Sequence, residues 1–209
     1  TASEQLKKIL KETHELVDLQ YSTYNRSLIP ALKKRGLKII SEHESLSEEQ
    51  KKFVDAYFEE NVYPVLTPMA MDSSRPFPLI RNKTLNIGAL ICRKDDKEKH
   101  KTLDFATVQV PSVLPRIVEL PEGKDGEKRV ILLEEIIERN IGQLFLSYDV
   151  VCAHPYRVMR NADLSIDEDE AEDLLKEIQK QLKKRQWGEV IRLAGYLKRR
   201  VCRERQRCI

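Results

Sequence analysis

Four prolines in one short stretch constrain this chain more than any other feature of its sequence. Residues 63–79 contain Pro64, Pro68, Pro76 and Pro78, four of the nine prolines in 209 residues. Each proline fixes its φ angle and removes an amide donor, so we expect neither a helix nor a central strand in this stretch. The stretch is also apolar, so we expect it to pack against a core and to connect a helical front part to an α/β body. Its apolar residues are Val65, Leu66, Met69, Met71, Phe77 and Leu79.

The beginning of the chain has the pattern of one long amphipathic helix over residues 3–34. Its apolar residues recur at steps of three, four and seven, which places them on one helical face. Pro30 is expected to kink this helix and Gly36 to end it. About 30 residues at 1.5 Å each give a length of roughly 45 Å, so the far end needs a second surface to cover it. The apolar residues are Leu6, Ile9, Leu10, Leu16, Val17, Tyr24 and Leu28.

The rest of the chain alternates short strands with helices. Ser47 and Gln50 form a capping box that begins a second helix, which is expected to end before Pro64. A second capping box, Ser165 with Glu168, precedes a helix whose buried face would hold Leu174, Leu175, Ile178 and Leu182. A further helix is expected over residues 134–145, and strands are expected at 36–40, 84–92, 105–110, 116–120, 130–133, 148–159 and 190–193.

Together these elements predict an α+β fold, with long amphipathic N-terminal helices followed by a mainly antiparallel sheet with helices on one face. Pro155 lies inside one expected strand, so that strand must be at a sheet edge or carry a bulge there. We expect a helical segment over residues 1–62, an α+β core over 63–193 and an atypical basic tail over 194–209.

The net charge of +3 comes from the end of the chain. Residues 198–209 carry a net charge of +5, so residues 1–197 carry −2. The body is therefore not basic, and nucleic acid is not expected as its partner. No apolar run approaches the roughly 20 residues of a membrane span, and the start of the chain has no signal-peptide pattern. The first residue is not Met, so we interpret the chain as a fragment of a cytoplasmic parent.

Side chains that could perform chemistry are few. Cys92, Cys152, Cys202 and Cys208 lack the spacing of metal ligands and are interpreted as buried free thiols. His154 could accept a phosphoryl group, but a nucleophilic histidine needs an orienting carboxylate and a cationic pocket, so we interpret it as a structural residue of an edge strand. The carboxylates of residues 167–173 follow a helix cap and do not converge, so Mg²⁺ binding is not predicted. No catalytic, cofactor-binding or metal residue is therefore assigned.

Five arginines are the better functional candidates. Guanidinium groups near strand ends and proline-containing loops could line a path for a polyanion. They could equally form salt bridges between domains, and the sequence leaves both readings open. The residues are Arg75, Arg81, Arg116, Arg157 and Arg160.

Four segments in order resemble bacterial polyphosphate kinase. They are Tyr-Pro-Val-Leu-Thr-Pro at 63–68 with Arg-Pro-Phe-Pro-Leu-Ile at 75–80, Val-Gln-Val-Pro-Ser-Val-Leu-Pro-Arg at 108–116, Ala-His-Pro-Tyr-Arg-Val-Met-Arg-Asn-Ala-Asp-Leu at 153–164, and Asp-Glu-Asp-Glu-Ala-Glu-Asp-Leu-Leu at 167–175. The resemblance extends from near the first residue to about Leu193. It implies the end of the helical amino-terminal domain plus the head domain, which contributes to dimer formation in this family.

The resemblance also implies a parent enzyme that transfers the terminal phosphate of ATP to polyphosphate through a phosphohistidine, with Mg²⁺. The family's catalytic carboxy-terminal domains have no counterpart in these residues, so we expect this fragment to be inactive alone. Its expected role is subunit pairing, as a homodimer, and support of the parent's remaining domains. The parent is expected in the cytoplasm, where it could associate peripherally with a membrane.

The tail departs from the family. After Leu193 the family continues with a Glu-rich run, whereas this chain continues with the basic residues 198–207. This tail gives the alternative function, a stand-alone module that binds polyanions or nucleic acid. A third possibility is an independent phosphotransferase that uses His154.

Overall fold

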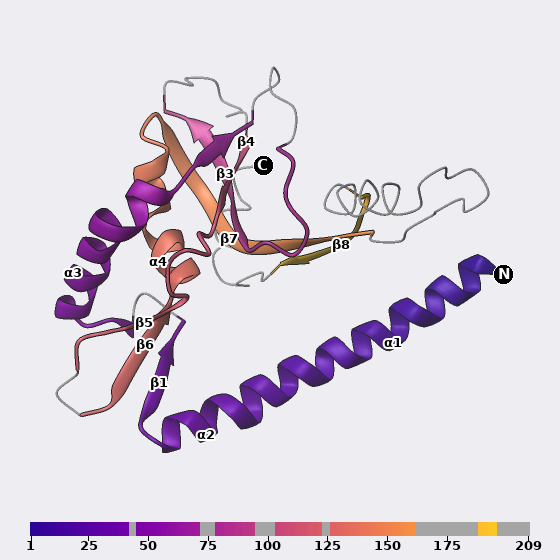
Figure 1. Cartoon of the computed structure of the whole chain (residues 1–209), viewed down its shortest axis with the longest axis horizontal. Helices are drawn as coiled ribbons and strands as arrows, with labels where there is room; N and C mark the ends of the chain where they lie inside the picture. The colour runs from indigo at the N-terminus through magenta and orange to yellow at the C-terminus, as the bar shows by residue number, and fades with distance from the viewer. Residues whose placement is uncertain (42–44, 72–77, 95–102, 123–125, 162–187, 196–209) are drawn as a thin grey trace, which may run out of the picture. The chain divides into compact units, whose positions relative to one another are not determined.

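A three-stranded mixed sheet and a five-stranded antiparallel sheet form the framework of the chain (Figure 1). The computed structural model describes residues 1–41, 45–71, 78–94, 103–122, 126–161 and 188–195. Unit 1 comprises Thr1–Val54 and Ile117–Leu132, and unit 2 comprises Asp55–Arg116 and Leu133–Ile209. These units do not divide the chain at residue 62, because residues 117–132 return to pair with the start of the chain. The domain boundaries given above therefore remain a prediction.

The long helix of unit 1 is continuous but changes its winding. It consists of α1 (Ala2–Thr23), a π-helical segment Tyr24–Leu28 and α2 (Ile29–Lys34). Thr1 and Glu4 form a capping box at its start. The π-helical segment ends two residues before Pro30, which has no amide hydrogen to donate and whose ring crowds the preceding turn, so the perturbation lies where the proline predicted it. Gly36 ends the helix at a φ of +80°, as expected.

The sheet of unit 1 joins segments that are far apart in the sequence. β1 (Leu37–Ile40) pairs in parallel with β6 (Lys128–Leu132), and β6 pairs antiparallel with β5 (Ile117–Glu119). The three strands were each expected, but their separate sheet and the parallel pair were not. A parallel pair needs a long connection, and here that connection contains Asp55–Arg116, the first of the two segments of unit 2.

The capping box predicted at Ser47 and Gln50 is formed. The amide of Gln50 donates to Ser47 Oγ (3.3 Å), and the amide of Ser47 donates to Gln50 Oε1 (3.2 Å). The same Gln50 side chain, which is fully buried, donates to the carbonyl of Pro121 at 3.1 Å. The capped helix is α3 (Glu48–Tyr57), which runs from unit 1 into unit 2.

The helical backbone continues beyond α3 and past Pro64. A π-helical segment, Phe58–Val62, is followed by a 3₁₀ turn, Tyr63–Val65. The helix and its π-helical continuation thus end before Pro64, as expected, and the separate 3₁₀ turn includes this proline because a missing amide is tolerated in the first turn of a helical segment. The proline-rich connector then contributes β2 (Pro68–Ala70), which is an edge strand. Residues 72–77 lie outside the described part.

The sheet of unit 2 has the order β2-β4-β3-β7-β8 and is antiparallel throughout. Its long strands are β3 (Asn86–Arg93), β4 (Asp104–Gln109), β7 (Tyr148–Arg160) and β8 (Val190–Gly195). β8 pairs only with Tyr156–Arg160 of β7, so the first half of β7 pairs with β3 alone among the described strands. β7 is an interior strand between β3 and β8, so the edge strand predicted from Pro155 is not observed; Pro155 itself lies opposite Ile87 of β3, just outside the residues that pair with β8.

One face of this sheet and one helix form the core of unit 2. α4 (Leu133–Asn140) contacts β3, β7 and the π-helical segment Phe58–Val62. A row of four alanines crosses the sheet, Ala70, Ala106, Ala89 and Ala153. The ion pair of Arg139 with Asp55, at 2.8 Å, links α4 to the end of α3. The fully buried residues of this core include Val54, Phe58, Val62, Ile87, Ile91, Val108, Ile136 and Ile137.

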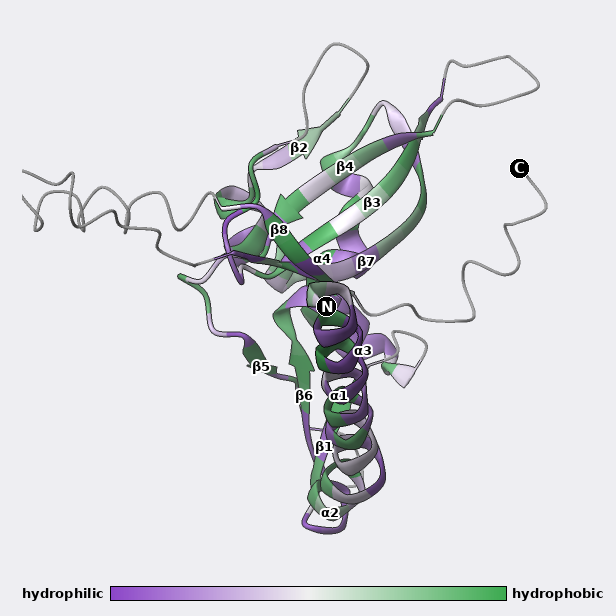
Figure 2. Ribbon diagram, turned by 90° about the vertical axis from the view of Figure 1, so that its right-hand side faces the viewer, coloured by the Kyte–Doolittle hydropathy of each residue, from purple (hydrophilic) through white to green (hydrophobic). Residues whose placement is uncertain are grey.

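The predicted fold class, α+β with a mainly antiparallel sheet and helices on one face, is confirmed. The 3₁₀ turn Ile141–Leu144 extends α4 almost to the predicted end. The helix predicted after Ser165 and its capping box lie outside the described residues, as do Cys202 and Cys208. Cys92 and Cys152 are free thiols, the first buried and the second half-buried. Figure 2 shows apolar residues on β3 and β4 of unit 2 and on β5 and β6 of unit 1.

Candidate functional site

The candidate site centres on β7, which carries the His-Pro-Tyr-Arg-Val-Met-Arg segment. Its register with β3 and β4 sets which side chains share a face of the sheet. His154 lies opposite Gly88, which lies opposite Thr107. Tyr156 lies opposite Asn86, two residues along the same face. This face is therefore polar in part, in contrast to the apolar face against α4.

Gly88 leaves room for two aromatic rings on this face. A Cβ atom built at Gly88 would lie 3.0 Å from the ring of Phe105 and 3.2 Å from the ring of Tyr156. These rings pack edge to face, with their centroids 6.3 Å apart. The absence of a side chain at Gly88 is thus needed for close packing of these two rings.

The hydroxyl of Tyr156 is paired with that of Thr107. Their oxygens are 2.8 Å apart, and either hydroxyl could be the donor. Burial raises the pKa of Tyr156 above its ordinary value of 10.0, and the hydrogen bond with Thr107 lowers it by a smaller amount. The phenol of Tyr156 is therefore neutral at physiological pH. Its hydrogen bond with Thr107 joins a side chain of β7 to one of β4, and neither hydroxyl is activated as a nucleophile.

The raised pKa of Tyr156 predicts a loss of stability in alkali. Above about pH 10 the unfolded chain releases this proton before the folded chain does, so stability falls as pH rises from there. Urea unfolding between about pH 8 and pH 11 should show a steeper fall for the native chain than for Tyr156→Phe, which lacks the group. Equal pH slopes for the two proteins would contradict the prediction.

His154 is placed in the interior of this face. Both of its ring nitrogens are shielded from solvent. A phosphoryl acceptor must meet its donor directly, and a shielded ring cannot do so without a rearrangement of β7. The structural role of His154 stays a prediction, and its strand β7 is an interior strand rather than the predicted edge strand.

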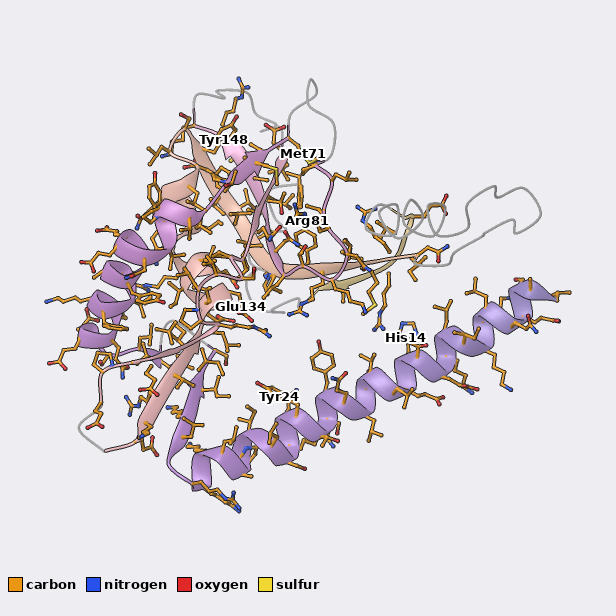
Figure 3. The ribbon with its side chains drawn as sticks, viewed as in Figure 1. His14, Tyr24, Met71, Arg81, Glu134 and Tyr148 are labelled. Carbon is orange, nitrogen blue, oxygen red and sulfur yellow. The ribbon has the colours of Figure 1, made fainter. Side chains whose placement is uncertain are left out.

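Arg116, which is exposed, forms an ion pair with the buried Glu134. Its Nε donates to Glu134 Oε1 and Oε2 at 3.1 and 3.2 Å, and its Nη2 also donates to Oε1. Glu134 lies in the first turn of α4, where a carboxylate suits the helix dipole, and its side chain is only 6% exposed. The backbone carbonyl of Arg116 accepts from the amide of Leu133 at the start of the same helix. Figure 3 shows Glu134 among the side chains of α4.

Arg160 joins three backbone segments at the end of β7. Its Nε donates to the carbonyl of Ile80 (2.8 Å), and its Nη1 donates to the carbonyl of Gly188 (2.9 Å). Its amide donates to Asn82 Oδ1 (3.0 Å). The turn at residues 81–84 is thereby held against β7, and Lys83 within it has a positive φ of 62°.

Arg81 and Arg157 differ from these two. Neither has an ion-pair partner among the residues that the structure describes. Arg81 is exposed on the turn (Figure 3), and Arg157 is half-buried on β7. Arg157 lies opposite Ala194 and diagonal to Arg192 of β8, on the same face. Arg75 lies outside the described residues.

The structure therefore divides the four described arginines of the predicted five, since Arg116 and Arg160 are bound within the fold and Arg81 and Arg157 are not. Sequence reasoning did not find the Tyr156–Thr107 pair or the burial of Glu134. A threonine in an alternating strand does not indicate which residue of another strand it will contact. Glu134 follows an apolar run, and the sequence there is equally compatible with a helix whose first turn is exposed to solvent. In the described part of the chain, no group of three or more metal-ligating side chains converges, and no helix there is long and apolar enough to cross a membrane.

The fold is similar to that of a solved polyphosphate kinase. The crystal structure of the enzyme from Porphyromonas gingivalis matches with a TM-score of 0.65 over 88% of this chain and 30% of that chain, at 24% identity. At 24% identity the match shows a similar fold and nothing further.

Sequence comparison defines the family. Residues 49–196 match the polyphosphate kinase middle domain. The polyphosphate kinase of Lactiplantibacillus plantarum is 50% identical over 193 residues, which is 92% of this chain and 26% of that protein. The enzyme of Halalkalibacterium halodurans is 44% identical over 92% of this chain and 27% of its own length. The chain belongs to the polyphosphate kinase family, and it spans about a quarter of these relatives' length.

Proposed function

We propose that this chain is a non-catalytic part of a polyphosphate kinase, the end of the helical amino-terminal domain plus the head domain. Its proposed role is subunit pairing and support of the remaining domains. The parent would transfer the terminal phosphate of ATP to polyphosphate through a phosphohistidine outside this chain, with Mg²⁺, in the cytoplasm. The match of residues 49–196 to the family's middle domain supports the parent's identity.

One observation carries the non-catalytic role. The side chains best suited to bind or accept phosphate already make contacts within the fold or are buried. Arg116 pairs with Glu134, Arg160 donates to two carbonyl groups, and both ring nitrogens of His154 are shielded from solvent. A phosphotransferase site needs cationic groups that converge on one phosphoryl position. Arg81 and Arg157 are the two described candidates that remain for contacts with a polyanion or another domain, together with Arg75.

Phosphate transfer by the chain alone tests this proposal. The chain is incubated with γ-labelled ATP, Mg²⁺ and polyphosphate, with the full-length Lactiplantibacillus plantarum relative as the positive control. We expect no elongation of polyphosphate by the chain and no acid-labile label on it. Label that disappears in a His154→Ala variant would overturn the proposal and assign an independent phosphotransferase.

The alternative function is polyanion or nucleic-acid binding through the basic tail, which lies outside the described residues. Counterion release would make such binding fall steeply between about 50 and 200 mM salt. Binding of polyphosphate that depends on residues 198–209 and on salt would favour this alternative. Binding that instead depends on Arg81 and Arg157 would place the contact on the head domain.

A further inference from the structure

Two segments flank the end of β7 from opposite sides. The amide of Arg160 donates to Asn82 Oδ1 (3.0 Å) in the 81–84 turn, which precedes β3. The next amide along the strand, that of Asn161, donates to the carbonyl of Glu189 (2.7 Å), directly before β8. Successive amides of a strand point to opposite sides, so the turn and the start of β8 bind opposite edges of the same strand. Figure 1 shows β8 beside β7.

The guanidinium group of Arg160 connects these two segments directly. Its Nε donates to the carbonyl of Ile80 (2.8 Å), beside the turn, and its Nη1 donates to the carbonyl of Gly188 (2.9 Å), before β8. Hydrogen bonds from a charged donor are stronger than those between neutral groups, and here one planar, rigid group makes both. A segment that moves away must therefore break a hydrogen bond with the group that also holds the other segment.

Both segments have backbone conformations that need support from their surroundings. Lys83 has a φ of 62°, which a lysine rarely adopts, and its amide donates to the carbonyl of Val158 (2.8 Å). At Gly188 the backbone comes so close to β7 that a Cβ atom would overlap the carbonyl oxygen of Asn161. Such conformations persist where neighbouring groups hold them. We therefore expect each segment to depend on its hydrogen bonds to β7.

We propose that the side chain of Arg160 is a latch that makes the 81–84 turn and the start of β8 open and close together. In the closed state, which the structure describes, the guanidinium group binds both segments, and in the open state both hydrogen bonds are broken. Because coupling between two sites is reciprocal, a contact that stabilises the turn, which carries Arg81, also stabilises β8, and the reverse holds. Every group of the latch lies within the described fold, so the latch does not depend on the function proposed above.

Native-state hydrogen exchange of two backbone amides tests the latch in the full 209-residue chain. Exchange at Lys83 measures opening of the turn and exchange at Asn161 measures opening of the start of β8, because each amide donates across to or from β7. Gly188→Ala disturbs β8, and it should speed exchange about tenfold at Asn161 and, through the latch, at Lys83 as well. Asn82→Ala disturbs the turn, and it should likewise speed exchange at both amides.

Arg160→Met removes the latch, because methionine has an unbranched side chain without a donor. In this background Gly188→Ala should speed exchange at Asn161 and leave exchange at Lys83 unchanged. Asn82→Ala should have the reverse effect. Circular dichroism checks that each variant is folded. If Arg160→Met unfolds the chain, Arg160→Lys takes its place, since a lysine cannot bind two separate carbonyls with a rigid fork.

The matched control is Arg157→Met, which changes a half-buried arginine of the same strand that binds neither segment in the described part of the chain. In the Arg157→Met background, Gly188→Ala should still speed exchange at both amides.

Three outcomes decide the matter. Coupled exchange in the native chain that disappears in the Arg160→Met background is the expected result. If Gly188→Ala speeds exchange at Asn161 alone in the native chain, the two segments open independently and there is no latch. If the coupling persists unchanged without the guanidinium group, the backbone of β7 carries it, and the role of Arg160 is overturned. Phosphate transfer by the chain, which tests the proposed function, is a separate measurement that none of these outcomes changes.

Discussion

Replacing Phe58 with alanine should lower the free energy of unfolding of unit 2 by about 3–5 kcal/mol. The side chain is fully buried in the π-helical segment that follows α3, and its ring packs edge to face with Tyr63, with centroids 6.1 Å apart. Truncation removes the buried ring and leaves a cavity beside α4, whose own core residues Ile136 and Ile137 are fully buried. The loss should be measured by urea unfolding followed by circular dichroism.

Two variants make this measurement specific. Phe58→Leu keeps most of the buried volume and should cost less than half as much. Val113→Ala changes a residue of the same unit that is 77% exposed, and its effect should stay within about 0.5 kcal/mol. If Phe58→Ala costs no more than Val113→Ala, the core does not include the π-helical segment.

Replacing Arg116 with methionine should cause the second-largest loss, lowering the free energy of unfolding by about 2 kcal/mol. The change leaves the carboxylate of Glu134 buried without its principal cation, which costs about 3–5 kcal/mol in fully buried pairs. The Arg116 side chain is 54% exposed, so water can reach the site and the expected loss is smaller. Urea unfolding at neutral pH measures it.

The double variant Arg116→Met with Glu134→Leu distinguishes the ion pair from simple packing. With both charges removed, no uncompensated carboxylate remains, so the double variant should be more stable than Arg116→Met alone. An additive loss in the double variant would mean that the two side chains contribute independently. Arg116→Lys keeps the charge but not the forked geometry of the guanidinium group. The free energy of unfolding of this variant should lie between those of the native chain and Arg116→Met.

The division of the arginines changes what can be expected of them. Arg116 and Arg160 are bound within unit 2, so their replacement should first affect stability. Arg81 and Arg157 lack such partners in the described part, so their replacement should first affect contacts beyond this chain. The sequence could not make this distinction, because the partners of Arg116 and Arg160 lie 18 to 80 positions away along the chain.

Local features of the fold could be predicted from the sequence because short-range chemistry decides them. The capping box of Ser47 and Gln50, the helix end at Gly36, the perturbation near Pro30 and the strand around Ile87 all follow from contacts within a few residues. Pro155, in contrast, was predicted to lie in an edge strand or at a bulge, and it lies in the interior strand β7, just outside the residues that pair with β8.

Tertiary structure alone decided the long-range features. The parallel pair of β1 with β6 depends on strands 91 positions apart in register, and nothing in either strand specifies the other. The same holds for Thr107 with Tyr156, which are 49 positions apart, and for Glu134, whose burial follows from its pairing with Arg116. The sequence determined which segments are helices and strands and which family the chain resembles, because those are local patterns. Which side chains meet, and hence which arginines remain available, depends on how distant segments pack, and only the folded chain shows it.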